Sequence, residues 1–333
     1  MAVGSTRRLL ARGAQGLVVV ALVATVVFVL IRLAPGDPFA ATLDDPRLDP
    51  AVRARWRAAY GLDGSLATQY VRWLAALGRG DLGWSTSRSA PVAAVLAESV
   101  PWTLLLGGTS MVLAFAIGMP LGAWQARRRG SRGDRAVSVA TIVGGALPDF
   151  WFALVLLLVF AVRLRLVPIG GAVDPLLPLD ASPAARLADL LRHLALPLAA
   201  SPLLLLGLVA RLQRTALLDR LGADWVRTAH AKGVAPAHVF RRHAWRTALG
   251  PMVTLGGLAI PGILGAGVFV EHVFAWPGFG AVAAGAIAAR DPHLVVGCAM
   301  VGTVLVVLGS ALADVVGARL DPRLRDADAA ERA

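Results

Sequence analysis

The sequence predicts an all-α, polytopic membrane protein with six transmembrane helices. Hydrophobic residues make up 57% of the 333 residues and charged residues only 16%, whereas soluble domains carry about 25% charged residues. This balance excludes a disordered chain, a fibrous repeat and most soluble enzymes. A helix needs about 20 apolar residues to cross the hydrocarbon core, and six stretches reach or approach that length: Gly13–Ile31, Val100–Ala126, Ala136–Val162, Leu194–Ala210, Thr247–Val270 and Leu294–Ala313.

The first apolar stretch has two interpretations, a cleaved signal peptide or a retained helix. The stretch follows Arg7, Arg8 and Arg12, and a positively charged segment of this kind precedes signal peptides and retained helices alike. The stretch is as long as a full span, however, and residues 32–37 that follow it do not form a small-residue cleavage site. We therefore expect a retained signal-anchor helix.

Arginine is distributed unevenly among the loops, and this predicts the orientation of the spans. The short loop Arg127–Arg135 carries five arginines, and Arg211–Arg246 carries eight basic residues against two acids. Loops with this excess lie on the cytoplasmic side. We expect both termini in the cytoplasm, and the net charge of +12 then reflects topology rather than nucleic-acid binding.

The loop between the first two spans, residues 34–99, is long enough to form an external layer. It has seven basic and seven acidic residues, and helical pieces are expected at Pro50–Tyr60 and Ala67–Leu77. The predicted organisation is a tail and first span at 1–33, this layer at 34–99, a five-helix core at 100–320 with a cytoplasmic coupling loop at 211–248, and a tail at 321–333.

The sequence offers no catalytic or metal-binding motif. A P-loop requires Gly-Lys-Ser/Thr, and the only lysine, Lys232, lies between Ala231 and Gly233. Cys298 is the single cysteine, and its apolar neighbours favour a small buried hydrophobic residue. The histidines lack metal-ligand spacing, and no Gly-x-Ser-x-Gly elbow is present. We expect no enzyme and no cofactor bound by this chain.

The coupling loop contains the most informative stretch. A helix-forming run starts after Gly222 and ends at Gly233, a residue suited to a helix C-terminus. A second helix is expected from about Pro236, leading into the fifth span. A loop of this length between spans is more typical of a partner-docking element than of a plain surface loop.

At these residues the chain resembles the inner-membrane permease subunits of ABC importers, of the dipeptide, oligopeptide and nickel type. Arg227–Gly233 matches the family's EAA-type loop, although Arg227 stands where the general pattern has Glu, and His243-Ala-Trp-Arg246 replaces its closing Ile-x-Leu-Pro. Both departures are usual in the peptide branch. Further matches follow in order along the chain: Ala34–Pro38, Tyr60–Asp63, Gln69–Trp73, Gly80–Gly83, Leu147–Trp151, Val270–Gly280 and Leu320–Arg325.

The resemblance implies a type I importer fold and a multi-pass protein of the bacterial inner membrane. It implies a second permease subunit, two cytoplasmic ATPase subunits that bind ATP and Mg²⁺, and an external binding protein. Peptides are the expected substrate on frequency alone, and nickel chelates, glutathione and sugars remain open. The coupling residues implied are Asp224, Trp225, Arg227, Thr228, Ala229, Lys232 and Gly233.

Three further residues are candidates for the translocation path or its gate. Asp149 follows Pro148 inside the third span, where an ionisable group faces a cavity or a partner. It either meets a substrate amine or binds backbone groups that Pro148 leaves free. Trp151 accompanies it, and Glu271 lies beside the fifth span. An ion-gradient-driven carrier would rely on Asp149, and a non-transporting scaffold would leave the coupling loop unexplained.

Overall fold

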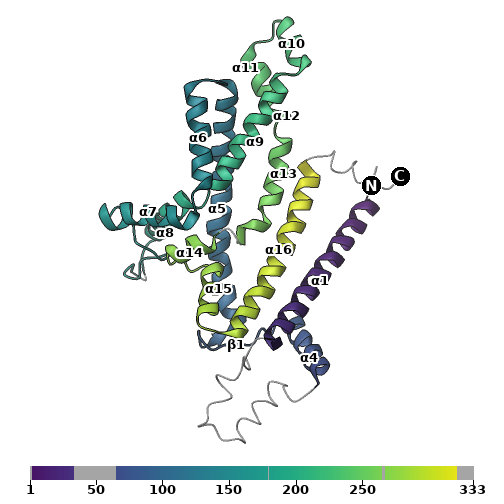
Figure 1. Ribbon diagram of the computed structural model, residues 1–333, viewed down its shortest axis with the longest axis vertical. Helices are drawn as coiled ribbons and strands as arrows, with labels where there is room; N and C mark the ends of the chain where they lie inside the picture. Colours follow the sequence, from purple (N-terminus) through teal and green to yellow (C-terminus); the bar gives the residue numbers. More distant parts are fainter. Residues whose placement is uncertain (1, 34–64, 179, 265–266, 321–333) are drawn as a thin grey trace, which may run out of the picture. The chain divides into compact units, whose positions relative to one another are not determined.

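The computed structural model describes residues 2–33, 65–178, 180–264 and 267–320 of the chain (Figure 1). The chain divides into two compact units. One contains residues 1–100 and 282–307, and the other contains residues 101–281 and 308–333. The regular structure of the described residues is helical except for two strands of two residues each, so the predicted all-α class is confirmed.

The first unit begins with helix α1 (Ala2–Leu33) and continues with α4 (Leu66–Gly78) and a short antiparallel hairpin. The hairpin strands are β1 (Trp84–Ser85) and β2 (Ala90–Pro91). Its other elements are the start of α5 (Val92–Arg127), most of α15 (Phe279–Ala288) and the start of α16 (Pro292–Leu320). Helix α4 confirms the expected helix at Ala67–Leu77, and Pro50–Tyr60 lies outside the described residues.

The core of the first unit joins α1, α4 and α16. Ala24, Val296 and Met300 are buried, and Trp73 of α4 packs against them. A buried carboxylate, Asp291, ties the hairpin to the start of α16. It accepts hydrogen bonds from the hydroxyls of Ser85 (2.6 Å) and Ser87 (2.8 Å) and from the backbone amides of Ser87 (3.0 Å) and Leu294 (3.1 Å).

The second unit contains the remainder of α5 and a succession of shorter helices. They are α6 (Arg132–Ala146), α7 (Asp149–Leu156), the π-helix η1 (Leu157–Arg163), α8 (Pro183–Ala200), α9 (Leu203–Leu221), α10 (Asp224–Ala231), α11 (Pro236–His238), the π-helix η2 (Val239–Ala244), α12 (Trp245–Thr247), α13 (Gly250–Ala259), the 3₁₀-helix η3 (Pro261–Leu264) and α14 (Val268–Val273).

Three described helices are long and apolar enough to cross a membrane: Arg12–Leu30, Val92–Arg127 and Pro292–Val316. Three helix pairs reach the same length and composition together but are bent at a short break. The α6/α7 pair is bent by 102°, α8/α9 by 59°, and the pair from α13 to α14 by 44° across the undescribed residues 265 and 266. The count rises to the predicted six when each pair is one span.

Proline explains the positions of the breaks. Pro148 and Pro202 are the residues that precede α7 and α9, and Pro261 begins η3. Proline has no backbone N–H and disfavours helical geometry in the residue before it. The sequence places a break at Pro148 within Ala136–Val162 and shows Pro197 and Pro202 within Leu194–Ala210, and in the structure each stretch consists of two helices.

Several expected boundaries also move. Helix α5 begins at Val92 rather than Val100 and passes through Pro101 without ending. Residues 211–221, expected to open the coupling loop, form the last part of α9. Residues 279–288, expected to lie in a loop, form the short apolar helix α15.

Close backbone contact joins α5 to α9 within the second unit. Gly118 and Gly122 of α5 face α9, and a Cβ atom at Gly122 would collide with the carbonyl oxygen of Ala210. Small residues at such positions let helix backbones approach closely in a membrane. This contact places the end of α5 beside the part of the chain that leads to α10.

Candidate functional site

Helix α10 presents most of the predicted coupling residues to solvent. Asp224, Trp225, Arg227 and Thr228 are exposed, whereas Val226 is buried and Ala229 half-buried. The ion pair between Asp224 and Arg227, 3.6 Å long, is almost fully exposed, so it does little to hold the helix together. A helix of eight residues is unstable alone, so its conformation depends on its ends and its attachment.

The C-terminal end of α10 is fixed by hydrogen bonds that require Gly233. The Gly233 amide donates to the carbonyl oxygen of His230 at 2.9 Å, and the Val234 amide donates to that of Ala229 at 3.1 Å. This pair of bonds is the Schellman motif, which needs a left-handed residue after the helix. Gly233 has φ of +77°, and no atom lies within 4 Å of the position of a Cβ. The predicted helix-ending role of Gly233 is confirmed.

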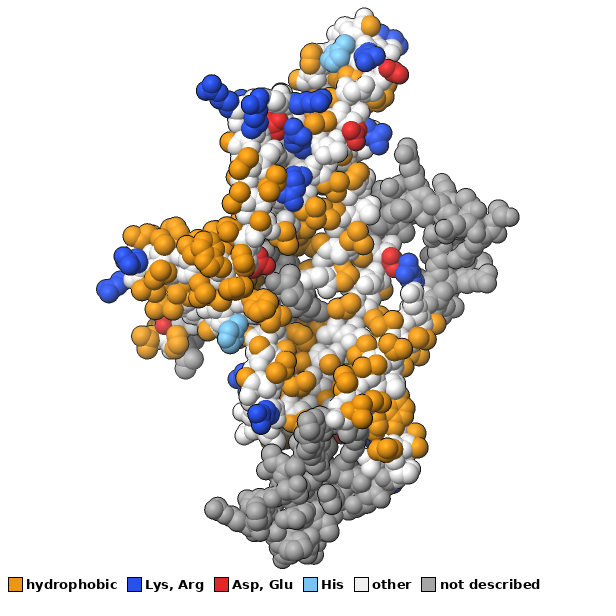
Figure 2. All heavy atoms as spheres, in the orientation of Figure 1, with side chains coloured by type: hydrophobic (Ala, Val, Ile, Leu, Met, Phe, Trp, Pro, Cys, Tyr) orange, Lys and Arg blue, Asp and Glu red, His pale blue; other side chains and the backbone are white. Residues whose placement is uncertain are grey.

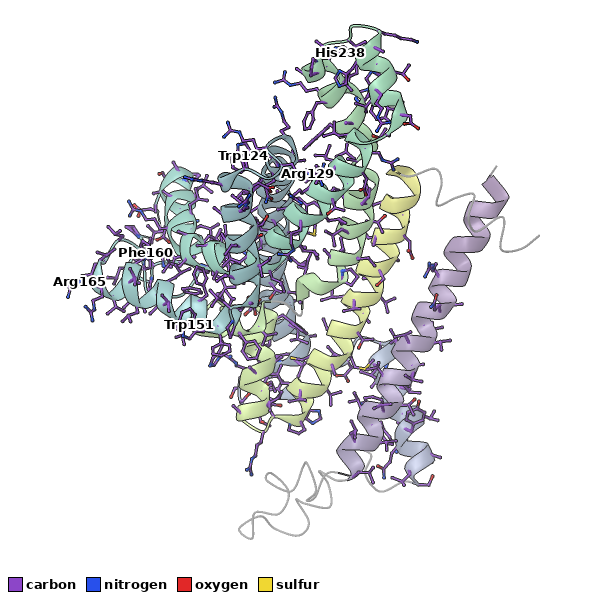
Figure 3. All side chains as sticks on the ribbon, turned by 45° about the horizontal axis from the view of Figure 1, so that its top comes forward. Trp124, Arg129, Trp151, Phe160, Arg165 and His238 are labelled. Carbon is purple, nitrogen blue, oxygen red and sulfur yellow. The ribbon has the colours of Figure 1, made fainter. Side chains whose placement is uncertain are left out.

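A helical stretch from Pro236 to Thr247 follows the turn and carries α10. The ring of Trp225 packs edge-on against His243 with 6.1 Å between centroids. Val239 and Ala244 of the same stretch are buried. Figure 3 labels His238 in this region, and Figure 2 shows Lys and Arg side chains gathered over α6 and the α10–α12 region. The second expected helix is thus present, with a π-helical turn in its middle.

Asp149 lies at the first position of α7, directly after the bend at Pro148. It is half-buried, and its side chain forms no hydrogen bond or ion pair with another described residue. Trp151, two residues further, is 48% exposed and stands on α7 in Figure 3. Both predicted residues therefore lie in the first turn of α7, directly after the break, but two positions apart they do not share a helix face.

Glu271 on α14 has a different environment, because its side chain is 1% exposed and fully engaged. The Thr103 hydroxyl of α5 donates to Oε1 at 2.5 Å, and the Ala281 amide donates to Oε2 at 3.0 Å. Ala281 belongs to the first turn of α15, where helix amides favour negative charge. A Cβ at Gly278 would collide with this carboxylate.

The neighbouring aromatic pair strengthens the same contact between α5 and the chain after α14. The indole N–H of Trp276 donates to the backbone oxygen of Trp102 at 3.0 Å, and the two rings meet edge-to-face at 5.5 Å. The Phe279 amide donates to Thr103 at 2.7 Å. Sequence reasoning missed Thr103 and Trp102, since nothing in the local pattern marks a residue 168 positions from its partner.

Among the described residues, no group of three or more His, Cys, Asp or Glu side chains could hold a metal ion. Glu271 and Asp149 lie in the same unit as α10 but on other helices, α14 and α7. The predicted residues therefore form two separate sites, a solvent-exposed coupling segment (Asp224–Gly233) and residues at helix breaks.

Comparison with known proteins assigns the chain to a family. Residues 118–326 match the family described as binding-protein-dependent transport system inner membrane component. The oligopeptide transport system permease protein AppB of Bacillus subtilis is 36% identical over 89% of this chain and 92% of that protein. The dipeptide permease DppB of Escherichia coli is 30% identical over 90% and 92%.

A solved structure shares the fold. The chain matches a subunit of the inward-facing MetNI methionine ABC transporter with a TM-score of 0.51 and 18% identity, covering 68% of this chain and 96% of that one. The helical architecture is therefore that of a type I importer permease. The chain belongs to the binding-protein-dependent inner-membrane component family and is a permease subunit of an ABC importer.

Proposed function

We propose that this chain forms one half of the transmembrane pathway of an importer for short peptides. The similarity to oligopeptide, di/tripeptide and dipeptide permeases over about nine-tenths of the chain supports the peptide class. An external binding protein delivers the peptide, and a second, homologous permease supplies the other half of the pathway. The assembly lies in the bacterial inner membrane with both termini of this chain in the cytoplasm.

Energy comes from two separate ATPase subunits that bind ATP and Mg²⁺. The observation that supports this division is the exposed coupling segment, Asp224–Gly233. It displays Trp225, 37% exposed, on a helix whose end is fixed by the Schellman turn at Gly233. Exposed aromatic side chains on a rigid element are typical of protein-binding surfaces.

The coupling segment transmits motion because it is short and attached at both ends. Closure of the ATPase pair displaces α10, and the stretch Pro236–Thr247 carries that displacement to α13. The pathway then alternates between its two open states, which couples ATP binding to access. Ala229, half-buried and small, lets the helix approach its partner closely.

The experiment compares two glycines that end helices in the same way. Gly80 after α4 has φ of +77°, open space at its Cβ position, and the same pair of hydrogen bonds, from Gly80 to Leu77 and from Asp81 to Ala76. Valine at such a position costs about 1–2 kcal/mol in either place. The tagged importer is purified as Gly233→Val and as Gly80→Val, and co-purified ATPase is measured.

We expect Gly233→Val to co-purify about tenfold less ATPase than the wild type, and Gly80→Val to co-purify as much as the wild type. Retention of ATPase by both variants would overturn the coupling role. Transport in proteoliposomes separates the energy sources, because an ATP-driven importer stops without ATP whatever the ion gradient. Labelled dipeptide, oligopeptide, nickel chelate and glutathione, each tested with the binding protein, identify the substrate class.

A further inference from the structure

A groove of about 510 Å³ opens beside the end of α5, and the residues that line it belong neither to α10 nor to α7. Its walls include Trp124, Arg127 and Arg128 from α5 and Phe240 and Trp245 from the stretch that carries α10. Of the described residues that line it, none is acidic. Figure 3 labels Trp124 at this end of α5.

The two arginines are held by aromatic rings rather than by carboxylates. The Arg127 guanidinium lies 5.2 Å from the centre of the Phe240 ring, and that of Arg128 lies 5.3 Å from the Trp124 ring. Stacking on a ring orients a guanidinium but leaves its N–H groups available. Both arginines are exposed, so their donors can reach an anion in the groove.

The groove adjoins a packed cluster of small side chains, of which Ala123 lines it. Ala123 and Ala126 of α5 are buried against Ala244 and Ala248, and the rings of Phe240 and Trp245 pack on the same cluster. The groove is therefore part of the contact between α5 and the stretch from Pro236 to Thr247. The shape of the groove is therefore determined by packed helices and not by a surface loop.

An apolar track leads from the arginines along α5. Ile117, Pro120 and Trp124 share a helix face with Arg127, at spacings of three, four and three residues. Ile117 is 49% exposed and Pro120 is also exposed. This face belongs to the membrane-spanning helix Val92–Arg127, which ends at these arginines. The two arginines therefore lie at the end of the span, directly beyond its exposed apolar face.

We propose that this groove binds an anionic phospholipid. Arg127 and Arg128 bind its phosphate, the rings of Trp124 and Trp245 lie at headgroup level, and an acyl chain follows Pro120 and Ile117. Basic pockets at the cytoplasmic ends of spans bind anionic headgroups, and the positive-inside rule assigns this end to the cytoplasm. A free phosphate ion would use the arginines but not the apolar track.

The bound lipid would stabilise the stretch Pro236–Thr247, which carries the coupling segment. Phe240 and Arg127 also line a second cavity of about 190 Å³, which extends to His230 of α10. A headgroup that holds Arg127 against Phe240 therefore fixes the stretch that carries α10. The lipid acts as a structural ligand of the coupling region.

The test counts lipids retained by the purified importer in native mass spectrometry. Phosphatidylglycerol is compared with phosphatidylcholine of identical acyl chains, and inorganic phosphate is added in a third arm. The variant is Arg127→Gln/Arg128→Gln. The matched control, Arg129→Gln/Arg132→Gln, removes the same charge from exposed residues of the same region that do not line the groove.

The wild type and the control are expected to retain more phosphatidylglycerol than phosphatidylcholine. In the variant, the ratio of the two retained lipids should fall about fivefold for each arginine replaced. Arg127→Lys/Arg128→Lys, which keeps the charge, is expected to retain most of it and shows that a loss is not due to misfolding. Equal retention of both lipids, or equal loss in variant and control, would overturn the proposal. So would displacement by millimolar phosphate, or exclusion of the lipid whenever the ATPase is bound.

Discussion

Arg214 of α9 binds Asp134 of α6 through two parallel hydrogen bonds, from Nε to Oδ1 and from Nη2 to Oδ2, each 2.9 Å long. The Asp134 side chain is 4% exposed and also accepts from the Gly130 amide at 2.9 Å and from Gln125 of α5 at 3.3 Å. One carboxylate thus joins three helices and the turn between two of them. These helices support the groove and lead to the coupling segment.

Arg214→Gln should destabilise the importer, because it leaves a buried carboxylate without its cation. Breaking a fully buried pair costs about 3–5 kcal/mol, and the partial exposure of Arg214, 28%, lowers the expectation to about 2 kcal/mol. The melting temperature of the purified complex measures the effect. Arg220→Gln, an exposed arginine of the same helix, is the control, and an equal change in both variants would contradict the structure.

Gly122→Ala should separate α5 from α9. The added methyl group would collide with the Ala210 carbonyl oxygen and stand 3.0 Å from the Arg214 amide, which are backbone atoms that cannot move aside alone. We expect a loss of about 1–3 kcal/mol in stability. Gly108→Ala on the same helix meets no atom within 4 Å and should be neutral or slightly stabilising. If Gly122→Ala is as stable as Gly108→Ala, the close contact is incorrect.

Acid should weaken the hairpin of the first unit through Asp291. Burial alone would raise the pKa of Asp291. The hydrogen bonds from Ser85, Ser87 and Leu294 lower it by more than burial raises it, so the pKa lies below its ordinary value. A carboxyl with a lowered folded-state pKa contributes stability above its unfolded pKa of about 3.9, and this contribution disappears as the pH falls through the folded value.

The corresponding measurement is protease cleavage of residues 84–91 between pH 7 and pH 3. The wild type should resist cleavage until the pH falls below about 4. Asp291→Asn should already be sensitive at neutral pH and show little further change on acidification. A wild type whose sensitivity changes only above pH 5 would show that another group controls this segment.

Asp149→Asn should impair uptake of peptides that have a free amino terminus. A hydrogen bond between charged groups contributes about 1.5–3 kcal/mol, so uptake should fall by about tenfold or more. An N-acetylated peptide lacks the charge and should be transported equally by the variant and the wild type. Asp180→Asn, an exposed residue outside the helices, is the control. A parallel loss for both peptides would indicate a structural role.

The sequence predicts the parts of the fold that depend on local pattern. Apolar length reveals the spans, and Gly233 marks the end of α10 because only glycine readily adopts its conformation. Pro148 and Pro202 are visible in the sequence, but whether a proline bends a helix or is tolerated, as Pro101 is in α5, depends on tertiary packing. The break at Pro148 is thus visible in the sequence, whereas the angles of the bends could not be predicted from it.

The candidate sites show the same division. The exposed face of α10 could be predicted from its composition, whereas the groove beside Arg127 depends on Phe240, which is more than a hundred residues away. Glu271 was expected at a gate, and the structure adds that Thr103 and Ala281 hold it. Its role as a gate remains a prediction. Contacts between residues so distant in sequence leave no trace in local spacing.

The burial of Glu271 has a consequence for biosynthesis. Thr103 is translated 168 residues before Glu271, whereas the Ala281 amide follows ten residues after it. A carboxylate without partners costs a few kcal/mol in lipid. The full set of contacts at Glu271 is therefore complete only after the first turn of α15 has been synthesised, although Thr103 is available from the start.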